Sequence, residues 1–336
     1  MKHAWSAQYR RWEGESVGVW TRRLSIARYG LKLCLGGKVI RIFLILSLAQ
    51  MLVMSGFFFL FGQLVAPESA LLLWLEGMGG KEVTDLFRAL TSWALLYPEI
   101  CVDGVYRVIY YFFSFSCPFL TMVIVALFVH KLISGDLASN AIVIYNSKAL
   151  TRWDYLIGKF MVVSTILSII WIFPVVGSWL LSNLLSPDWS FFYHSFPSLV
   201  RGLTIGIVAV VSLSCLAMLI SSLARKTGAA VTYWILGWIS LGMISGAAQF
   251  AHPALQYLSP VNALRAVSGG IYRMLDLVVD AQGMLPFFGG LFRKVSDGTD
   301  PAELPISNGE IVLPLMALAC YCAVSIVIVS RKVRAS

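Results

Sequence analysis

Charged residues are scarce in this chain. Only 13% of its 336 residues are Asp, Glu, Lys or Arg, whereas 58% are hydrophobic. A soluble domain carries about 25% charged residues, so the composition excludes an ordinary water-soluble fold. The mean hydropathy of +0.79 leads to the same conclusion, that lipid surrounds most of the chain.

Apolar residues form six runs, each long enough to cross a bilayer, which takes about 20 residues in a helix. They cover residues 40–65, 106–134, 160–183, 200–223, 229–250 and 311–330. Lipid offers no partners for backbone N–H and C=O groups, so each run is expected to be a helix. The sequence therefore predicts an all-α integral membrane protein, with a six-span domain at 40–330 between tails at 1–39 and 331–336.

Basic residues are divided unevenly between the two sides of the membrane. An even number of spans puts both termini on one side, together with the connections at 131–159 and 224–228. That side carries 18 of the 26 Lys and Arg residues. Cytoplasmic loops carry an excess of Lys and Arg, so both termini are predicted to lie in the cytoplasm.

Two shorter helices are predicted outside the spans. Residues 19–38 place apolar side chains at spacings of three and four beside basic ones, which is typical of a helix in the membrane interface. Its apolar face is formed by Trp20, Leu24, Ala27, Leu31 and Leu35. Ser259 followed by Pro260 predicts the start of a second helix, in the extracytoplasmic segment before the last span.

Spans four and five each carry two glycines four residues apart. Gly202 and Gly206 lie in the fourth span, and Gly242 and Gly246 lie in the fifth. Small residues at this spacing allow helices to approach closely. We expect helix packing at these positions, and a contact with a second copy of the chain is the alternative.

The interiors of the spans carry almost no charge, and the chain shows no recognised catalytic motif. No run contains Asp or Glu, which an ion-coupled or proton-coupled carrier would need. The chain also lacks the His-Glu-x-x-His, Gly-x-Ser-x-Gly and P-loop motifs. No catalytic, cofactor-binding or metal-binding residue is therefore assigned, an enzyme is not expected, and any energy source would have to be a partner.

Charged residues at the span ends are expected to face polar surroundings. Arg107 and Arg201 lie at outer ends and Lys159 at an inner end, where long side chains can reach the interface. Glu99 and Asp103 precede the second span and are expected on a solvated face, with a cation site as the alternative.

A charged island at 147–159 separates the second and third spans. The charge count puts it in the cytoplasm. Thr151 and Asp154 fit a capping box that would start the third helix before it enters lipid. Upstream, apolar spacing from Asp136 to Tyr145 predicts a short helix on the membrane surface. Such a loop is suited to docking by a soluble partner, and an ordinary interfacial loop is the alternative.

Two stretches around this island carry a family resemblance. They are Ile133-Ser134-Gly135-Asp136 and Ser147-Lys148-Ala149-Leu150-Thr151-Arg152-Trp153-Asp154-Tyr155-Leu156-Ile157-Gly158-Lys159. Both are similar to the inner loop of permeases of the type-2 class of ABC exporters. The stretches Ser221-Ser222-Leu223-Ala224-Arg225-Lys226 and Leu258-Ser259-Pro260 add weaker support. The chain departs from the family pattern at Asp136, where Glu is usual, at Ala149, where Pro is usual, and at Ser139-Asn140, where Gly-Thr is common.

The resemblance implies a complex of two permease chains, identical or related, with a cytoplasmic ABC ATPase dimer that holds ATP and Mg²⁺. It implies a coupling helix at about 136–147 and a location in the plasma (inner) membrane of a bacterium or archaeon. The implied ATPase-coupling residues are Asp136, Tyr145, Lys148, Arg152 and Asp154.

We therefore expect the permease subunit of an ATP-driven exporter. The few polar groups in the spans favour a lipophilic or amphipathic substrate. Topology and contact with membrane lipids, rather than nucleic acid, account for the net charge of +9. The alternative is a mechanotransmitting or structural subunit of an ABC complex that moves no cargo itself.

Overall fold

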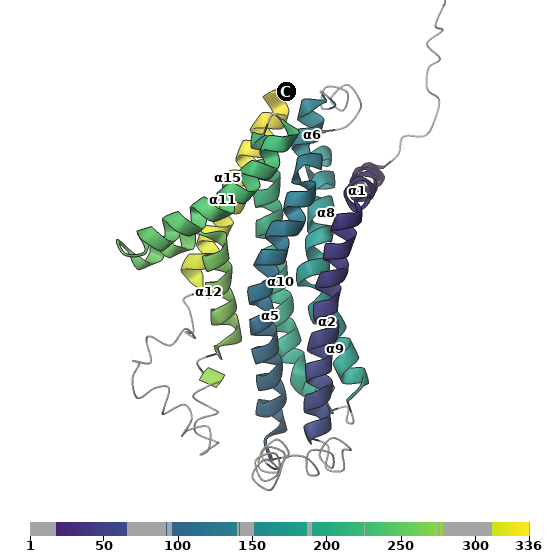
Figure 1. Cartoon of the computed structure of the whole chain (residues 1–336), viewed down its shortest axis with the longest axis vertical. Helices are drawn as coiled ribbons and strands as arrows, with labels where there is room; N and C mark the ends of the chain where they lie inside the picture. The colour runs from purple at the N-terminus through teal and green to yellow at the C-terminus, as the bar shows by residue number, and fades with distance from the viewer. Residues whose placement is uncertain are drawn as a thin grey trace, which may run out of the picture.

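The computed structural model describes residues 18–65, 92, 96–139, 141, 151–186, 190–224, 226–274, 276–277 and 311–335. Throughout these residues the regular structure is helical. Six helical segments are long and apolar enough to cross a membrane (Figure 1). The chain is therefore a multi-pass membrane protein, and the prediction of an all-α fold with six spans is confirmed at this level.

The six segments run back and forth through one bundle (Figure 1). They are α2 (Lys38–Val65), α5 (Pro98–Phe128), α8 (Arg152–Trp171) continued by α9 (Phe173–Leu184), α10 (Ser190–Leu223), α11 (Thr227–Ala248) and α15 (Val312–Ala335). α10 lies at the centre, because it packs against α5, α8, α9 and α15. α11 is the least buried of the six.

The second span begins earlier than the sequence indicated. α5 starts at Pro98, well before the predicted start at 106. Proline is favoured in the first turn of a helix, where its missing N–H leaves no hydrogen bond unmade. Asp103 and Arg107 then lie one turn apart, with carboxylate and guanidinium 2.6 Å apart. This part of the chain is therefore helix rather than loop, and the ion pair between successive turns adds a small stabilisation to it.

The third span is bent. α8 gives way to α9 at Ile172, and Pro174 stands in the first turn of α9. Proline removes one backbone hydrogen bond and displaces the preceding turn. The Ile172 N–H still donates to the Ser168 carbonyl at 3.0 Å, so the helix continues across the bend.

α11 leaves the bundle at an angle, and the chain returns through η2 (Pro253–Leu258) and α12 (Pro260–Tyr272) (Figure 1). α12 begins at Pro260 with Ser259 in the N-cap position, as predicted, although the Ser259 side chain makes no cap hydrogen bond. It packs on α5, α10 and α15. This helix therefore belongs to the packed bundle rather than to its surface.

Aromatic and hydroxyl side chains fill the interior together. Phe58 of α2 stacks on Tyr106 of α5 with ring centroids 3.9 Å apart, and Tyr106 forms a hydrogen bond with Ser182 of α9. Trp171 Nε1 donates to Thr121 Oγ1 at 2.9 Å. Buried polar groups need partners within the protein, and these pairs fix how α2, α5, α8 and α9 face one another.

α1 (Val19–Leu35) precedes the first span and packs across α8. Figure 1 places it at the same end of the bundle as α6 (Ile133–Ala138) and the last turns of α15, which we call the α1 end. The predicted helix is present, and the face that it packs on α8 differs in part from the apolar face predicted to lie in the membrane interface. Ala27, Gly30 and Cys34 are buried, whereas Trp20 is 66% exposed. Small residues face α8 because they permit a closer approach.

Candidate coupling site

The chain turns back on itself between the second and third spans, at the α1 end. α5 passes through a short 3-10 turn into α6, and Ser221 of α10 fixes this turn. The Ser221 hydroxyl donates to the Val129 carbonyl at 2.8 Å. It accepts the N–H groups of Ile133 and Ser134 at 3.0 and 3.1 Å. One buried serine therefore provides partners for backbone groups at the turn.

Asp136 of α6 is held by two side chains of α8. Its Oδ2 atom accepts a hydrogen bond from the Tyr155 hydroxyl at 2.7 Å and lies 2.8 Å from Lys159 Nζ. Lys159 also donates to the Leu132 carbonyl at 2.9 Å. The Lys159 side chain is 9% exposed and that of Asp136 is 18% exposed. The ion pair lies largely out of water, so removing one charge would leave the other poorly compensated.

Asp154 closes the first turn of α8 and also binds α1. Thr151 Oγ1 accepts the Asp154 N–H at 3.2 Å, and Asp154 Oδ2 accepts the Thr151 N–H at 3.3 Å. The predicted capping box is therefore confirmed. The other carboxylate oxygen lies 2.7 Å from Arg23 Nε, and the Asp154 side chain is 3% exposed. One carboxylate thus caps α8 and fastens α1 to it.

Two glycines bring α1 and α8 into close contact. A Cβ atom at Gly158 of α8 would lie 2.8 Å from the Ile26 Cβ atom of α1. A Cβ atom at Gly30 of α1 would lie 2.6 Å from the Val162 Cγ2 atom of α8. Both distances are shorter than carbon atoms tolerate, so the two helices pack at a distance that only glycine permits.

Three helices consequently form one unit, which we call the α1–α6–α8 corner. The two ion pairs fasten α6 and α1 to α8. A further link joins the base of α6 to α1, because Lys131 Nζ donates to the Leu33 carbonyl at 3.2 Å. A displacement of α6 would therefore be passed to α8, which is the first part of the third span.

Arg152 and Trp153 lie on the outer face of this corner. The Arg152 guanidinium lies 5.7 Å from the centre of the Trp153 ring, in a cation–π arrangement. Both side chains are exposed, Trp153 to 44%. Arg and Trp are enriched among the residues that dominate binding energy at protein interfaces. This pair is therefore open to a partner in a way that Asp136 and Asp154 are not.

The structure describes three of the five predicted coupling residues. Asp136, Arg152 and Asp154 all lie at the α1–α6–α8 corner, whereas Tyr145 and Lys148 lie outside the described residues. Of the surface helix predicted from Asp136 to Tyr145, the structure describes only residues 136–139 and 141. Residues 136–138 belong to α6, which starts at Ile133, where the Ser221 hydroxyl binds the backbone, and ends at Ala138.

Lys159, Arg23 and Ser221 are site residues that sequence reasoning missed. The expectation that Lys159 reaches the interface is wrong, because the side chain is buried against Asp136. The sequence feature that points to this role is Tyr155, which lies one turn before Lys159 on the same helix face and also contacts Asp136. Nothing in the sequence indicated that α6 would pack on that face.

The two predicted glycine pairs have different surroundings. A Cβ atom at Gly202 would lie 2.8 Å from Val175 Cγ1, and one at Gly206 would lie 3.0 Å from Ile172 Cγ1, at the bend of the third span. Gly242 and Gly246 of α11 have no atom within 4 Å of such a Cβ among the described residues. The first pair lies at a tight helix contact, whereas the second pair faces away from every other described residue.

The charged groups of the corner serve to hold helices together. Within the described part of the chain, no three metal-ligating side chains come together. Burial raises the pKa of the Cys34 thiol to about 11, and the nearby Lys131 and Lys159 oppose this shift only in part. The thiol therefore stays protonated at neutral pH and is a poor nucleophile.

No protein-family model matches this chain, and no curated protein matches its sequence. Its function must therefore be inferred from the membrane fold and from the α1–α6–α8 corner.

Proposed function

We propose that this chain is the membrane-spanning permease subunit of an ATP-driven ABC exporter of the type-2 class. The α1 end faces the cytoplasm, where a separate ABC ATPase dimer docks and supplies ATP and Mg²⁺. A second permease chain, identical or related, completes the complex in the plasma membrane of a bacterium or archaeon. The exported substrate is lipophilic or amphipathic.

The observation that carries this proposal is the attachment of α6 to the third span. A subunit that receives its energy from a partner needs an element that the partner can bias between two states. α6 suits this role because the Asp136–Lys159 pair, at 2.8 Å, joins it to α8 with little access to water. The Asp154–Arg23 pair extends the connection to α1.

Within this proposal, the coupling residues divide into two roles. Asp136 and Asp154 hold the corner together, whereas Arg152 and Trp153 are exposed and available to the ATPase. Replacing Asp136 by Lys would place a second ammonium group next to that of Lys159, and their repulsion would disrupt the corner itself. A change at Arg152 is therefore the sharper probe of docking.

Co-expression with a candidate P-loop ATPase that has no membrane spans, sought first among the neighbouring genes, tests the proposal. We expect the wild-type chain to co-purify with that ATPase and Arg152→Glu to weaken the association at least about tenfold, as expected for loss of one charged anchor. Arg331→Glu is the control, because Arg331 is exposed on the last turns of α15 at the same end. Equal loss in both variants, or no association of the wild type, would contradict the proposal.

Transport in sealed vesicles separates the two versions of this function. Inside-out vesicles that hold the assembled complex should accumulate an amphipathic substrate when ATP is added. A mechanotransmitting subunit would bind the same ATPase and depend on Arg152 in the same way, yet it would move no cargo.

A further inference from the structure

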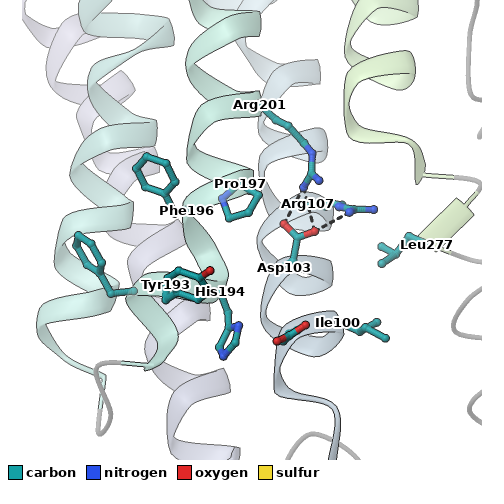
Figure 2. Close-up of a pocket in the computed structure, with 11 residues that line it drawn as sticks. Ile100, Asp103, Arg107, Tyr193, His194, Phe196, Pro197, Arg201 and Leu277 are labelled. Carbon is teal, nitrogen blue, oxygen red and sulfur yellow. Dashed lines mark hydrogen bonds and ion pairs between the residues drawn. The ribbon is translucent and has the colours of Figure 1, made fainter.

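A pocket of about 550 Å³, drawn in Figure 2, lies among the first turns of α5, at the end of the bundle opposite α1 (Figure 1). The first turns of α5 and of α10 form its walls. The α5 side is charged, with Glu99, Asp103 and Arg107 each one turn apart. The α10 side is mainly aromatic, with Phe192 and Phe196 among its residues. The pocket thus combines charge with apolar surface in one place.

Asp103 is the centre of the charged wall. Its carboxylate lies 2.6 Å from Arg107 Nη2, and both its oxygens accept hydrogen bonds from Arg201 Nη1, at 2.7 and 2.9 Å. Figure 2 shows both guanidinium groups pointing at this carboxylate. The expectation of a solvated Asp103 and two arginines reaching for the interface is therefore wrong. Charges from α5 and α10 neutralise one another instead, with the Asp103 side chain 14% exposed.

The two arginines retain unused hydrogen-bond donors. A guanidinium carries five N–H donors, and one carboxylate cannot accept all ten from two of them. Arg107 Nε is buried and has no partner among the described residues. Arg201 binds Asp103 through Nη1 alone. Asp103, Arg107 and Arg201 together carry one net positive charge, and all three residues line the pocket.

Phosphate fits these donors better than carboxylate does. Arg107 and Arg201 come from different helices and approach the Asp103 carboxylate from different sides (Figure 2). A tetrahedral phosphate offers oxygens in several directions, and arginine is suited to bind them. A planar carboxylate is already present as Asp103, and a second would leave some donors without acceptors.

Glu99 adds a negative charge at one side of the pocket. It stands four residues before Asp103 on α5, about 6 Å along the helix axis, and its side chain is exposed. A simple anion would be repelled there. A head group with an ammonium next to its phosphate would meet opposite charge at both positions, and its acyl chains could lie along Phe192 and Phe196.

We propose that this pocket binds the zwitterionic head group of a membrane amphiphile, with the phosphate on Arg107 and Arg201 and the ammonium beside Glu99. Phosphoethanolamine has this chemistry, and its primary ammonium can also donate hydrogen bonds to the Glu99 carboxylate, which the quaternary ammonium of phosphocholine cannot. The site needs no ATPase, so it can be tested on the full-length chain alone and stands or falls independently of the proposed function.

Lipid titration of the purified, delipidated chain, followed by native mass spectrometry, tests the proposal. The ligands are phosphatidylethanolamine, phosphatidylglycerol and soluble phosphoethanolamine. We expect phosphatidylethanolamine to bind most tightly and Arg107→Gln to weaken it at least about tenfold, as for loss of one charged hydrogen bond. Arg265→Gln is the control, because Arg265 is exposed on α12 and does not line the pocket.

Glu99→Gln provides the second arm, and it keeps the test valid if Arg107→Gln does not fold. We expect this substitution at an exposed residue to lower the affinity for phosphatidylethanolamine several-fold. The affinity for phosphatidylglycerol, which has no ammonium, should be unchanged or higher. Equal affinities of wild type and both pocket variants would overturn the proposal. Binding of soluble phosphoethanolamine as tight as that of the lipid would overturn the assignment to a membrane amphiphile.

Discussion

At the residue scale, charges beside the spans are paired across helices. Asp136 meets Lys159, Asp154 meets Arg23, and Asp103 meets Arg201. The sequence shows that these charges flank apolar runs, and the Thr151–Asp154 capping box could be predicted because both its residues belong to one helix turn. The pairs themselves could not be predicted, because each joins two helices that meet only through the packing of the whole bundle.

The Asp136–Lys159 pair should show strong non-additivity in a double-mutant cycle. Asp136→Asn alone leaves a buried ammonium poorly compensated and should cost roughly 2–3 kcal/mol, less than a fully buried pair because Asp136 is partly exposed. Adding Lys159→Met should recover part of this loss. The apparent melting temperature in detergent is the measurement, and additive losses would show that the two side chains do not interact.

Cys34 should resist alkylation while α1 stays on α8. Its raised pKa of about 11, against an ordinary value of 9.0, leaves roughly 100-fold less thiolate at pH 8. In a variant that keeps Cys34 as its only cysteine, maleimide labelling should be slow in mild detergent and fast in SDS. Because the pKa of Cys34 is raised in the folded chain, the protonated thiol contributes fully to the free energy of unfolding below pH 9. This contribution is lost as the pH rises through about 11. Equal labelling rates in both detergents would contradict the buried position.

At the element scale, apolar runs predict the spans well and their ends poorly. The run at 229–250 and helix α11 (Thr227–Ala248) nearly coincide. α5 instead extends back to Pro98, since Arg201 of another helix neutralises Asp103. The face of α1 that packs on α8 could not be predicted for a similar reason, because Gly158 lies on a partner helix that no spacing within α1 reveals.

Two glycine substitutions separate tight helix contact from open surface. Gly158→Ala adds a Cβ atom 2.8 Å from the Ile26 Cβ atom and should destabilise the chain by about 1–3 kcal/mol. It should also speed Cys34 labelling, because α1 must move away from α8. Gly242→Ala is the matched control: its Cβ would meet nothing within 4 Å, and alanine should be neutral or stabilising by up to about 1 kcal/mol. Equal melting temperatures for the two variants would argue against the close α1–α8 contact.

At the scale of the whole molecule, the same two helices connect both ends of the bundle. α10 carries Arg201 near its start and Ser221 near its end. α5 carries Asp103 near its start and leads into α6 beyond its end. A movement of the α1–α6–α8 corner can therefore reach the pocket at the opposite end through continuous helices. In our proposal, these helices link the α1 end, which would receive energy from the ATPase, to the pocket that would bind lipid.

ATP hydrolysis by the complex assembled in lipid nanodiscs tests the coupling role of the corner most directly. The Asp136→Asn/Lys159→Met double variant removes the charged link from α6 to α8 and leaves Arg152 in place for docking. We predict that the ATPase stays bound while its stimulation by the permease falls at least about fivefold, a coupling loss of roughly 1 kcal/mol. Undiminished stimulation in a variant that binds the ATPase normally would contradict the account.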